Sequence, residues 1–175
     1  MMRSFFTFPK IGLMAVGLFL MAPTVMLAQK GDTQEVLAHL YRNTNVETNL
    51  SKMAMKNSTN ADVKKFAHQV MSDDRNAGGE LMEYAMKYNL RLIAEAPAST
   101  VEAEKQMKKL TGEAFDKMYL VQMDAFVKDD QKTAAQASAI SDSEVSAIGT
   151  KIQNLASDRA KQITALTTGE GFQIQ

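Results

Sequence analysis

Apolar residues recur at intervals of three and four along most of the chain, which is the spacing of one face of an α-helix. This pattern predicts long helices at residues 32–57, 61–89, 113–138 and 142–167, with a short helix at 99–111. Short turns join the first two and the last two long helices, so we expect two antiparallel hairpins. Packed through their apolar faces, the hairpins form an all-α four-helix bundle with one short extra helix. The apolar stripes are Val36, Leu40, Leu50 and Ala54; Val63, Ala67, Val70, Ala77 and Leu81; Phe115, Tyr119, Met123, Phe126 and Ala134; and Val145, Ile148, Ile152, Leu155, Ile163 and Leu166.

Capping signals stand near the predicted helix starts. Three residues that can accept hydrogen bonds each precede a glutamate by three positions, the capping-box pattern: Asp32, Ser99 and Ser141. The turn at residues 57–60 (NSTN) ends in side chains that can cap the second long helix. Gly78 and Gly79 lie inside that helix and should weaken it. About 23 residues separate the second and third long helices. That length leaves open both a crossover connection and a simple up-down order.

The first 28 residues have the layout of a secretory signal. Arg3 and Lys10 are the charges that precede an uninterrupted run of apolar residues and glycine from Ile11 to Ala22. We expect cleavage after Ala28, with the alternative that the segment stays as a membrane anchor of roughly 17–25 residues. The predicted organisation is a signal peptide at 1–28, a bundle domain at 33–168 and a flexible tail at 169–175. The predicted location is the periplasm or cell envelope.

The composition excludes several kinds of functional site. The chain has no cysteine, which excludes disulfides, thiolate metal sites and cysteine nucleophiles. Its 20 basic and 20 acidic residues give no basic face for a nucleic acid. Gly-rich phosphate loops and serine-nucleophile motifs are missing from the sequence. We therefore expect that the protein is not an enzyme.

Three segments, 61–74 (ADVKKFAHQVMSDD), 110–120 (LTGEAFDKMYL) and 142–158 (DSEVSAIGTKIQNLASD), carry a family resemblance. Together they resemble an exported, ferritin-like bacterial domain family of unknown function, often labelled a membrane or outer-membrane protein. The resemblance implies a ferritin-like bundle and an envelope location, with no established activity. The family pattern has a Glu in the first helix, Asp-His in the second and a His in each of the last two.

Only part of that pattern is present in this chain. Glu47 and Asp73 match the family's acids, whereas Asp74, Val127 and Asp158 stand at the positions of its histidines. The family's imidazoles are therefore absent, and a metal role based on them does not carry over. Di-iron chemistry would also need Glu-x-x-His motifs, which the chain lacks.

Four acids nevertheless lie on or beside the apolar stripes, one in each long helix: Glu47, Asp74, Asp130 and Asp158. One interpretation is an all-oxygen site for a hard divalent cation such as Ca²⁺, Mg²⁺ or Mn²⁺. The other, which we favour, is that the acids pair with neighbouring bases and polar residues such as Lys52, Arg75, Arg159, Asn43 and Gln122. Counting from the turns puts Glu47 and Asp74 roughly 6 Å apart in depth.

The remaining candidate ligands have simpler interpretations. His39 and His68 fall off the main stripes, so we expect surface positions. The eight methionines after residue 28 could bind Cu(I), but filling of irregular core space is the interpretation we favour. The sequence therefore favours a non-catalytic envelope protein with a structural, interaction or stress-related role, without a cofactor. Its partner would be an unknown envelope protein, with membrane contact only through an uncleaved signal. The alternative is a metal-binding or storage protein.

Overall fold

The computed structural model describes residues 23–169, with side-chain surroundings for residues 31–168. It contains the helices α1 (Pro23–Asn57), α2 (Ala61–Lys87), α3 (Ala98–Met107), α4 (Gly112–Ser138) and α5 (Ser143–Gly169), and no strand within the described range. The prediction of an all-α bundle with one short extra helix is confirmed. Most of the expected signal segment and nearly all of the expected tail lie outside the described residues.

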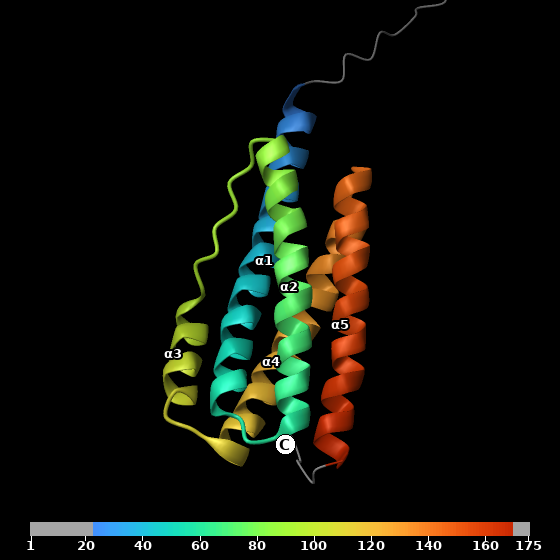
Figure 1. Ribbon diagram of the computed structural model, residues 1–175. Helices are drawn as coiled ribbons and strands as arrows, with labels where there is room; N and C mark the ends of the chain where they lie inside the picture. The colour runs from blue at the N-terminus through green and yellow to red at the C-terminus, as the bar shows by residue number, and fades with distance from the viewer. Residues whose placement is uncertain (1–22, 170–175) are drawn as a thin grey trace, which may run out of the picture.

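The connection between α2 and α4 is a crossover that runs the length of the bundle (Figure 1). The chain leaves the end of α2, returns along the outside of the bundle and passes through α3 to the start of α4. Contacts between helix ends agree with this connection. Lys87 at the end of α2 bonds Glu144 at the start of α5 at 2.5 Å, and Ser51 late in α1 bonds Tyr119 early in α4 at 2.9 Å. Neighbouring helices are therefore antiparallel, as in bundles of ferritin type.

Four of the five helices in the described range begin within one residue of their predicted starts, and α1 does not. Asn60 accepts bonds from the first amides of α2, and α4 begins one residue before its predicted start. At α5 the capping acceptor is Asp142, which bonds the amides of Glu144 and Val145 at 2.9 and 3.1 Å. The cap was predicted at Ser141 and lies one residue later, at Asp142.

The capping boxes predicted at Ser99 and Asp32 were wrong for different reasons. The short helix α3 follows Pro97, and no side chain caps it, so the expected box at Ser99 does not form. The first helix begins at Pro23, well before Asp32. Proline is favoured in the first turn of a helix because its fixed φ suits the helix and its missing N–H is not needed there. Asp32 is therefore an interior residue of α1.

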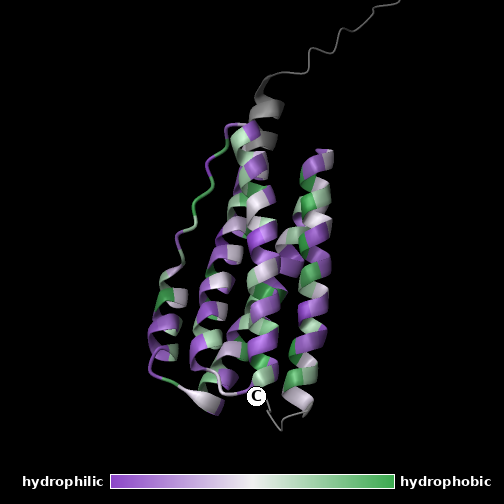
Figure 2. Cartoon of the chain, in the orientation of Figure 1, coloured by the Kyte–Doolittle hydropathy of each residue, from purple (hydrophilic) through white to green (hydrophobic). Residues whose placement is uncertain are grey.

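The apolar core falls into two clusters along the bundle. One, near the α1–α2 turn, includes Leu50, Val70 and Tyr119; the other, near the opposite end, includes Leu37 and Leu81. Hydrophobic and hydrophilic residues alternate along every long helix (Figure 2). Between the clusters the four long helices bury a set of polar and charged side chains.

The predicted core of α4 needs one correction. Tyr119 is fully buried as expected, but Phe126 is only partly buried, at the edge of the first cluster. Its neighbour Val127 takes the inward position instead. A helix turns about 100° per residue, so Phe126 and Val127 point in different directions, and only Val127 faces the core centre.

Candidate functional site

The buried polar set between the two apolar clusters draws on all four long helices, and we call it the central layer. Its members are Asn43 and Glu47 on α1, Asp74 on α2, Asp130 on α4 and Arg159 on α5. Each has between 0 and 4 % of its surface exposed. Charged side chains are almost never buried so completely unless they are paired. The partners within the layer therefore determine what this part of the bundle can do.

Arg159 is the organising residue of the central layer. Its Nη1 donates to Oε2 of Glu47 and its Nη2 donates to Oδ1 of Asp74, each at 2.6 Å. The guanidinium thus bridges α1 and α2 from α5. Charge-assisted hydrogen bonds of this length are among the strongest in proteins. The planar, permanently charged guanidinium suits such a bridge better than a lysine would.

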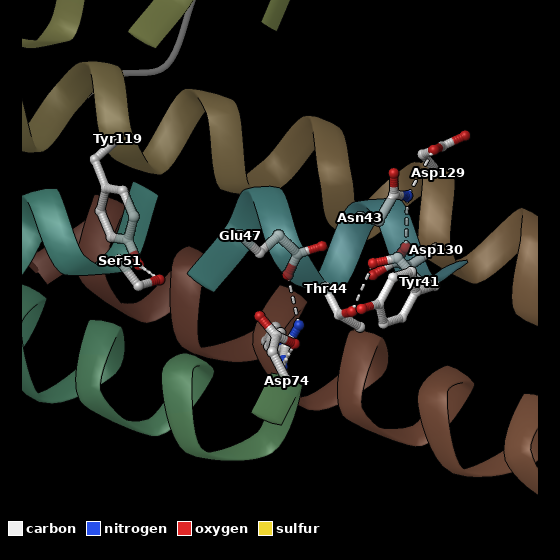
Figure 3. Close-up of polar contacts among 10 residues, drawn as sticks. Tyr41, Asn43, Thr44, Glu47, Ser51, Asp74, Tyr119, Asp129 and Asp130 are labelled. Carbon is white, nitrogen blue, oxygen red and sulfur yellow. Dashed lines mark hydrogen bonds and ion pairs between the residues drawn. The ribbon is translucent and has the colours of Figure 1, made fainter. Parts of the chain in front are cut away.

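Asp130 is held from α1 by an amide rather than by a base. Nδ2 of Asn43 donates to Oδ1 of Asp130 at 2.8 Å and to Oδ2 of Asp129 at 2.9 Å. Asp129 also accepts from Nε2 of His39 at 2.5 Å, nearer the surface. A line of polar contacts therefore leads from partly exposed His39 through Asp129 and Asn43 to Asp130. Figure 3 shows Asn43 between the two aspartates.

Burial changes the acidity of every carboxyl in the central layer. Loss of water, followed by the charges of Asp130 and Asp74, raises the pKa of Glu47 well above its ordinary value. Burial raises the pKa of Asp74 to about 7 despite the opposing effect of Arg159. Burial also raises the pKa of Asp130. Each carboxyl therefore binds a proton more readily than it would in water.

The pKa values of Asp129 and Arg159, which bond to the layer's other groups, are shifted in favour of the charged forms. Partial burial acts against ionisation of Asp129, but hydrogen bonds from Asn43 and His39 hold its pKa below the ordinary value. Burial acts to lower the pKa of Arg159, yet Glu47 and Asp74 hold it above the usual value. Arg159 and Asp129 are therefore charged at neutral pH.

Three of the four acids proposed from the sequence meet in the central layer, and the fourth does not. Asp158 lies on the exposed side of α5, where it accepts from Lys161 at 2.9 Å. Arg159, the next residue, supplies the buried group. From the sequence, Arg159 is only one of several bases that could pair with the acids. Its position three residues after Ala156 and four before Ile163, both buried, was the signal for its inward direction.

The arrangement at the centre is that of a closed ion-pair network. Among the described side chains, no group of three or more His, Asp and Glu residues has the arrangement of a metal site. The position between Glu47 and Asp74 is taken by a guanidinium, which supplies the positive charge that a cation would bring. His68 is exposed, and His39 bonds Asp129 outside the layer. These two placements agree with the surface positions expected for the histidines.

A groove between α2 and α5 reaches the outer side of Arg159. Its volume is about 640 Å³, and its apolar lining includes Phe66, Val70 and Leu155. Asp73 and Asp158 lie on its polar rim. Along residues 23–169, no helix is both long enough and apolar enough to cross a bilayer.

Comparison with known proteins relates the chain to a family and to a fold. Residues 21–168 match a domain of unknown function, DUF4142. No curated protein sequence matches the chain. A Streptomyces coelicolor protein described as secreted, with the domain DUF305, superposes with a TM-score of 0.70 at 11 % identity. The alignment covers 79 % of this chain and 94 % of that protein.

Two further similar structures are of the protein CopM. Its Cu(I)-bound form superposes with a TM-score of 0.67 at 16 % identity, over 78 % of this chain and 96 % of CopM. Its Ag-bound form gives 0.65 at 14 % identity, over 79 % and 96 %. Identities this low establish a shared fold and nothing further.

Proposed function

The chain belongs to the DUF4142 family, a domain of unknown function, and we propose that it is an exported, non-catalytic bundle protein of the cell envelope. Its role would be structural, interactive or stress-related. The observation that carries the proposal is the pair of hydrogen bonds from the buried guanidinium of Arg159, one to Glu47 and one to Asp74, each at 2.6 Å. In bundles that hold metals, inward-facing carboxylates form the metal site. In this chain a guanidinium already bonds two of those carboxylates.

The proposal for export rests on the signal-like segment at residues 1–28 and on the secreted description of one structural relative. The proposal for a non-catalytic role rests on the enclosure of the buried acids. Catalytic acids and bases must reach a substrate, whereas the acids of the central layer are enclosed between two apolar clusters.

A second candidate is metal binding, favoured by the fold shared with CopM, which has been solved with Cu(I), Cu(II) and Ag bound. Of these ions, Cu(I) and Ag(I) are soft and prefer thioethers to carboxylates. In this chain Met82 and Met86 lie one turn apart on α2, and Met86 is well exposed. Such a site would use the surface of α2 and leave the central layer intact.

One set of measurements tests both candidates. The full chain is expressed with its own N-terminus, and cell fractions are separated. N-terminal sequencing of the envelope form should begin near Gln29. Intact protein in the cytoplasm would refute export. The purified protein is then titrated with Cu(I), Ag(I), Mn²⁺ and Ca²⁺ while its melting temperature is followed.

The non-catalytic, metal-free proposal expects no change in melting temperature with any of these ions. A metal at 100 times its dissociation constant would stabilise the fold by about 2.7 kcal/mol. A rise with Cu(I) or Ag(I), lost in Met86→Leu, would favour the second candidate. Met55→Leu is the matched control, because Met55 is also exposed but lies on α1.

A further inference from the structure

Charge in the central layer is out of balance. Three carboxyls (Glu47, Asp74 and Asp130) face one guanidinium, Arg159. If every group were ionised, the layer would hold a net charge of −2 between two apolar clusters. Uncompensated buried charge is strongly unfavourable, and a buried acid normally takes up a proton instead. The question is which carboxyl holds that proton.

The hydrogen bonds point to one pair. Oε2 of Glu47 accepts from Arg159, but buried Oε1 has no N–H or O–H donor among the described residues. Both acids are buried in the central layer, and the charge of Asp130 contributes to the raised pKa of Glu47. In Figure 3 the free oxygen of Glu47 points to the side on which Asp130 lies. Ionised carboxylates only accept hydrogen bonds, so two of them cannot bond without a proton between them.

We propose that Glu47 and Asp130 form a proton-binding site, in which one proton shared between their facing carboxyl oxygens joins α1 to α4 at the centre of the bundle. The proton gives Glu47 Oε1 its missing partner and removes one negative charge from the layer. The amide of Asn43 fixes Asp130 through the other side of its carboxyl, at Oδ1. Shared protons of this kind occur where two carboxyls are so close that both cannot ionise.

The other groups facing the pair do not remove the need for this proton. Asp74 on α2 has its Oδ1 bonded to Arg159, while its buried Oδ2 has no hydrogen-bond partner among the described residues. Asp73 beside it is partly exposed. Asp129 on α4 has donors from Asn43 and His39. Tyr119 bonds Ser51, and burial raises its pKa, so it stays neutral. Arg42 on α1 lies near Asp129 and acts on that residue.

The site makes stability depend on pH with a definite sign. Because the folded pair has a raised pKa, the native state binds one more proton than the unfolded chain above pH ~4.3, the ordinary value for Glu. The stabilising effect is complete below that pH and is lost as the pH rises toward the pKa of the folded pair. Between these two pKa values, each unit of rise in pH increases the unfolding equilibrium constant about tenfold, because the native state binds one more proton than the unfolded chain.

The test replaces the shared proton by a permanent one. In Asp130→Asn the new amide still accepts from Asn43 and donates to Glu47 Oε1 without any titration. Unfolding constants of the wild-type chain and of Asp130→Asn are measured by urea denaturation from pH 5 to pH 7. We expect the ratio of variant to wild-type constants to fall about 100-fold over these two units. A ratio that stays constant would overturn the proposal.

Asp124→Asn is the matched control on α4, because Asp124 pairs with Lys128 at the surface. Its ratio to wild type should stay constant across the same range, and a 100-fold fall there would also overturn the proposal. A second measurement covers the case in which Asp130→Asn does not fold. The infrared spectrum of the native wild-type protein at pH 7, with ¹³C-labelled aspartate, should contain the carbonyl stretch of an un-ionised carboxyl. Absence of this band, from both labelled and unlabelled carboxyls, would refute the shared proton.

Discussion

Replacement of Arg159 by methionine should be the most damaging single change in the central layer. Methionine keeps much of the volume of the arginine stem but removes the cation from two buried acids. Breaking a buried ion pair from one side typically costs 3–5 kcal/mol. A direct calculation gives a similar figure, because the variant can restore the net charge of the layer by binding one further proton.

The cost of that proton depends on pH. For a carboxyl with an ordinary pKa of about 4.3, protonation at pH 7 costs about 3.7 kcal/mol, at 1.36 kcal/mol per pH unit. At pH 5 the same step costs about 1 kcal/mol. We therefore expect Arg159→Met to lower the free energy of unfolding by about 4 kcal/mol at pH 7, and by much less at pH 5. For a domain of this size the loss at pH 7 lowers the melting temperature by about 8–16 °C.

Urea denaturation and thermal melting at both pH values measure these losses directly. Lys161→Met is the matched control on α5, since Lys161 is exposed and its pair with Asp158 is a surface pair. Its effect should stay within about 0.5 kcal/mol. A loss below 1 kcal/mol for Arg159→Met at pH 7, or equal losses at pH 5 and pH 7, would refute this account of the central layer.

Three further predictions concern packing, and each is measured by urea denaturation. A Cβ at Gly149 would lie 2.5 Å from the backbone nitrogen of Ser138, so Gly149→Ala should destabilise the fold by about 1–3 kcal/mol. A Cβ at Gly79 would meet nothing within 4 Å, so Gly79→Ala should stabilise the fold by up to about 1 kcal/mol. If both glycine variants change stability equally, the close approach of α4 and α5 is wrong. Tyr119→Phe removes the buried bond to Ser51 and should cost about 1–3 kcal/mol, whereas an unchanged stability would mean that the bond contributes nothing. Phe126→Ala should cost less than the 3–5 kcal/mol of a fully buried Phe, and a loss in that range would place Phe126 in the core centre.

Helices could be predicted well from the sequence because their signals are local. The apolar spacing located all four long helices, and Asn60 behaves as its position in the turn suggested. Local signals were weaker where two candidates stand side by side, as with Ser141 and Asp142 at the start of α5. The start of α1 was missed because nothing in residues 23–31 except Gly31 opposes a helix, so the pattern gave no sharp boundary.

The central layer could be predicted only in part, because its geometry depends on how helices align with one another. Stripe positions correctly selected Glu47, Asp74 and Asp130 as candidates for the interior. They could not show that one long side chain from α5 reaches both Glu47 and Asp74. Asp158 was chosen by its match to a family histidine, yet its neighbour Arg159 faces inward. The direction of the α2–α4 connection also depends on packing between hairpins, which a single sequence does not contain.

The central claim is that an internal guanidinium takes the place of a metal ion between the bundle carboxylates. The most direct test is a crystal structure of the purified protein soaked in Mn²⁺, with an anomalous difference map calculated at the manganese absorption edge. We predict Arg159 bonded to both Glu47 and Asp74, and no anomalous peak in the central layer. A manganese peak coordinated by Glu47, Asp74 or Asp130, with Arg159 displaced from them, would contradict the account.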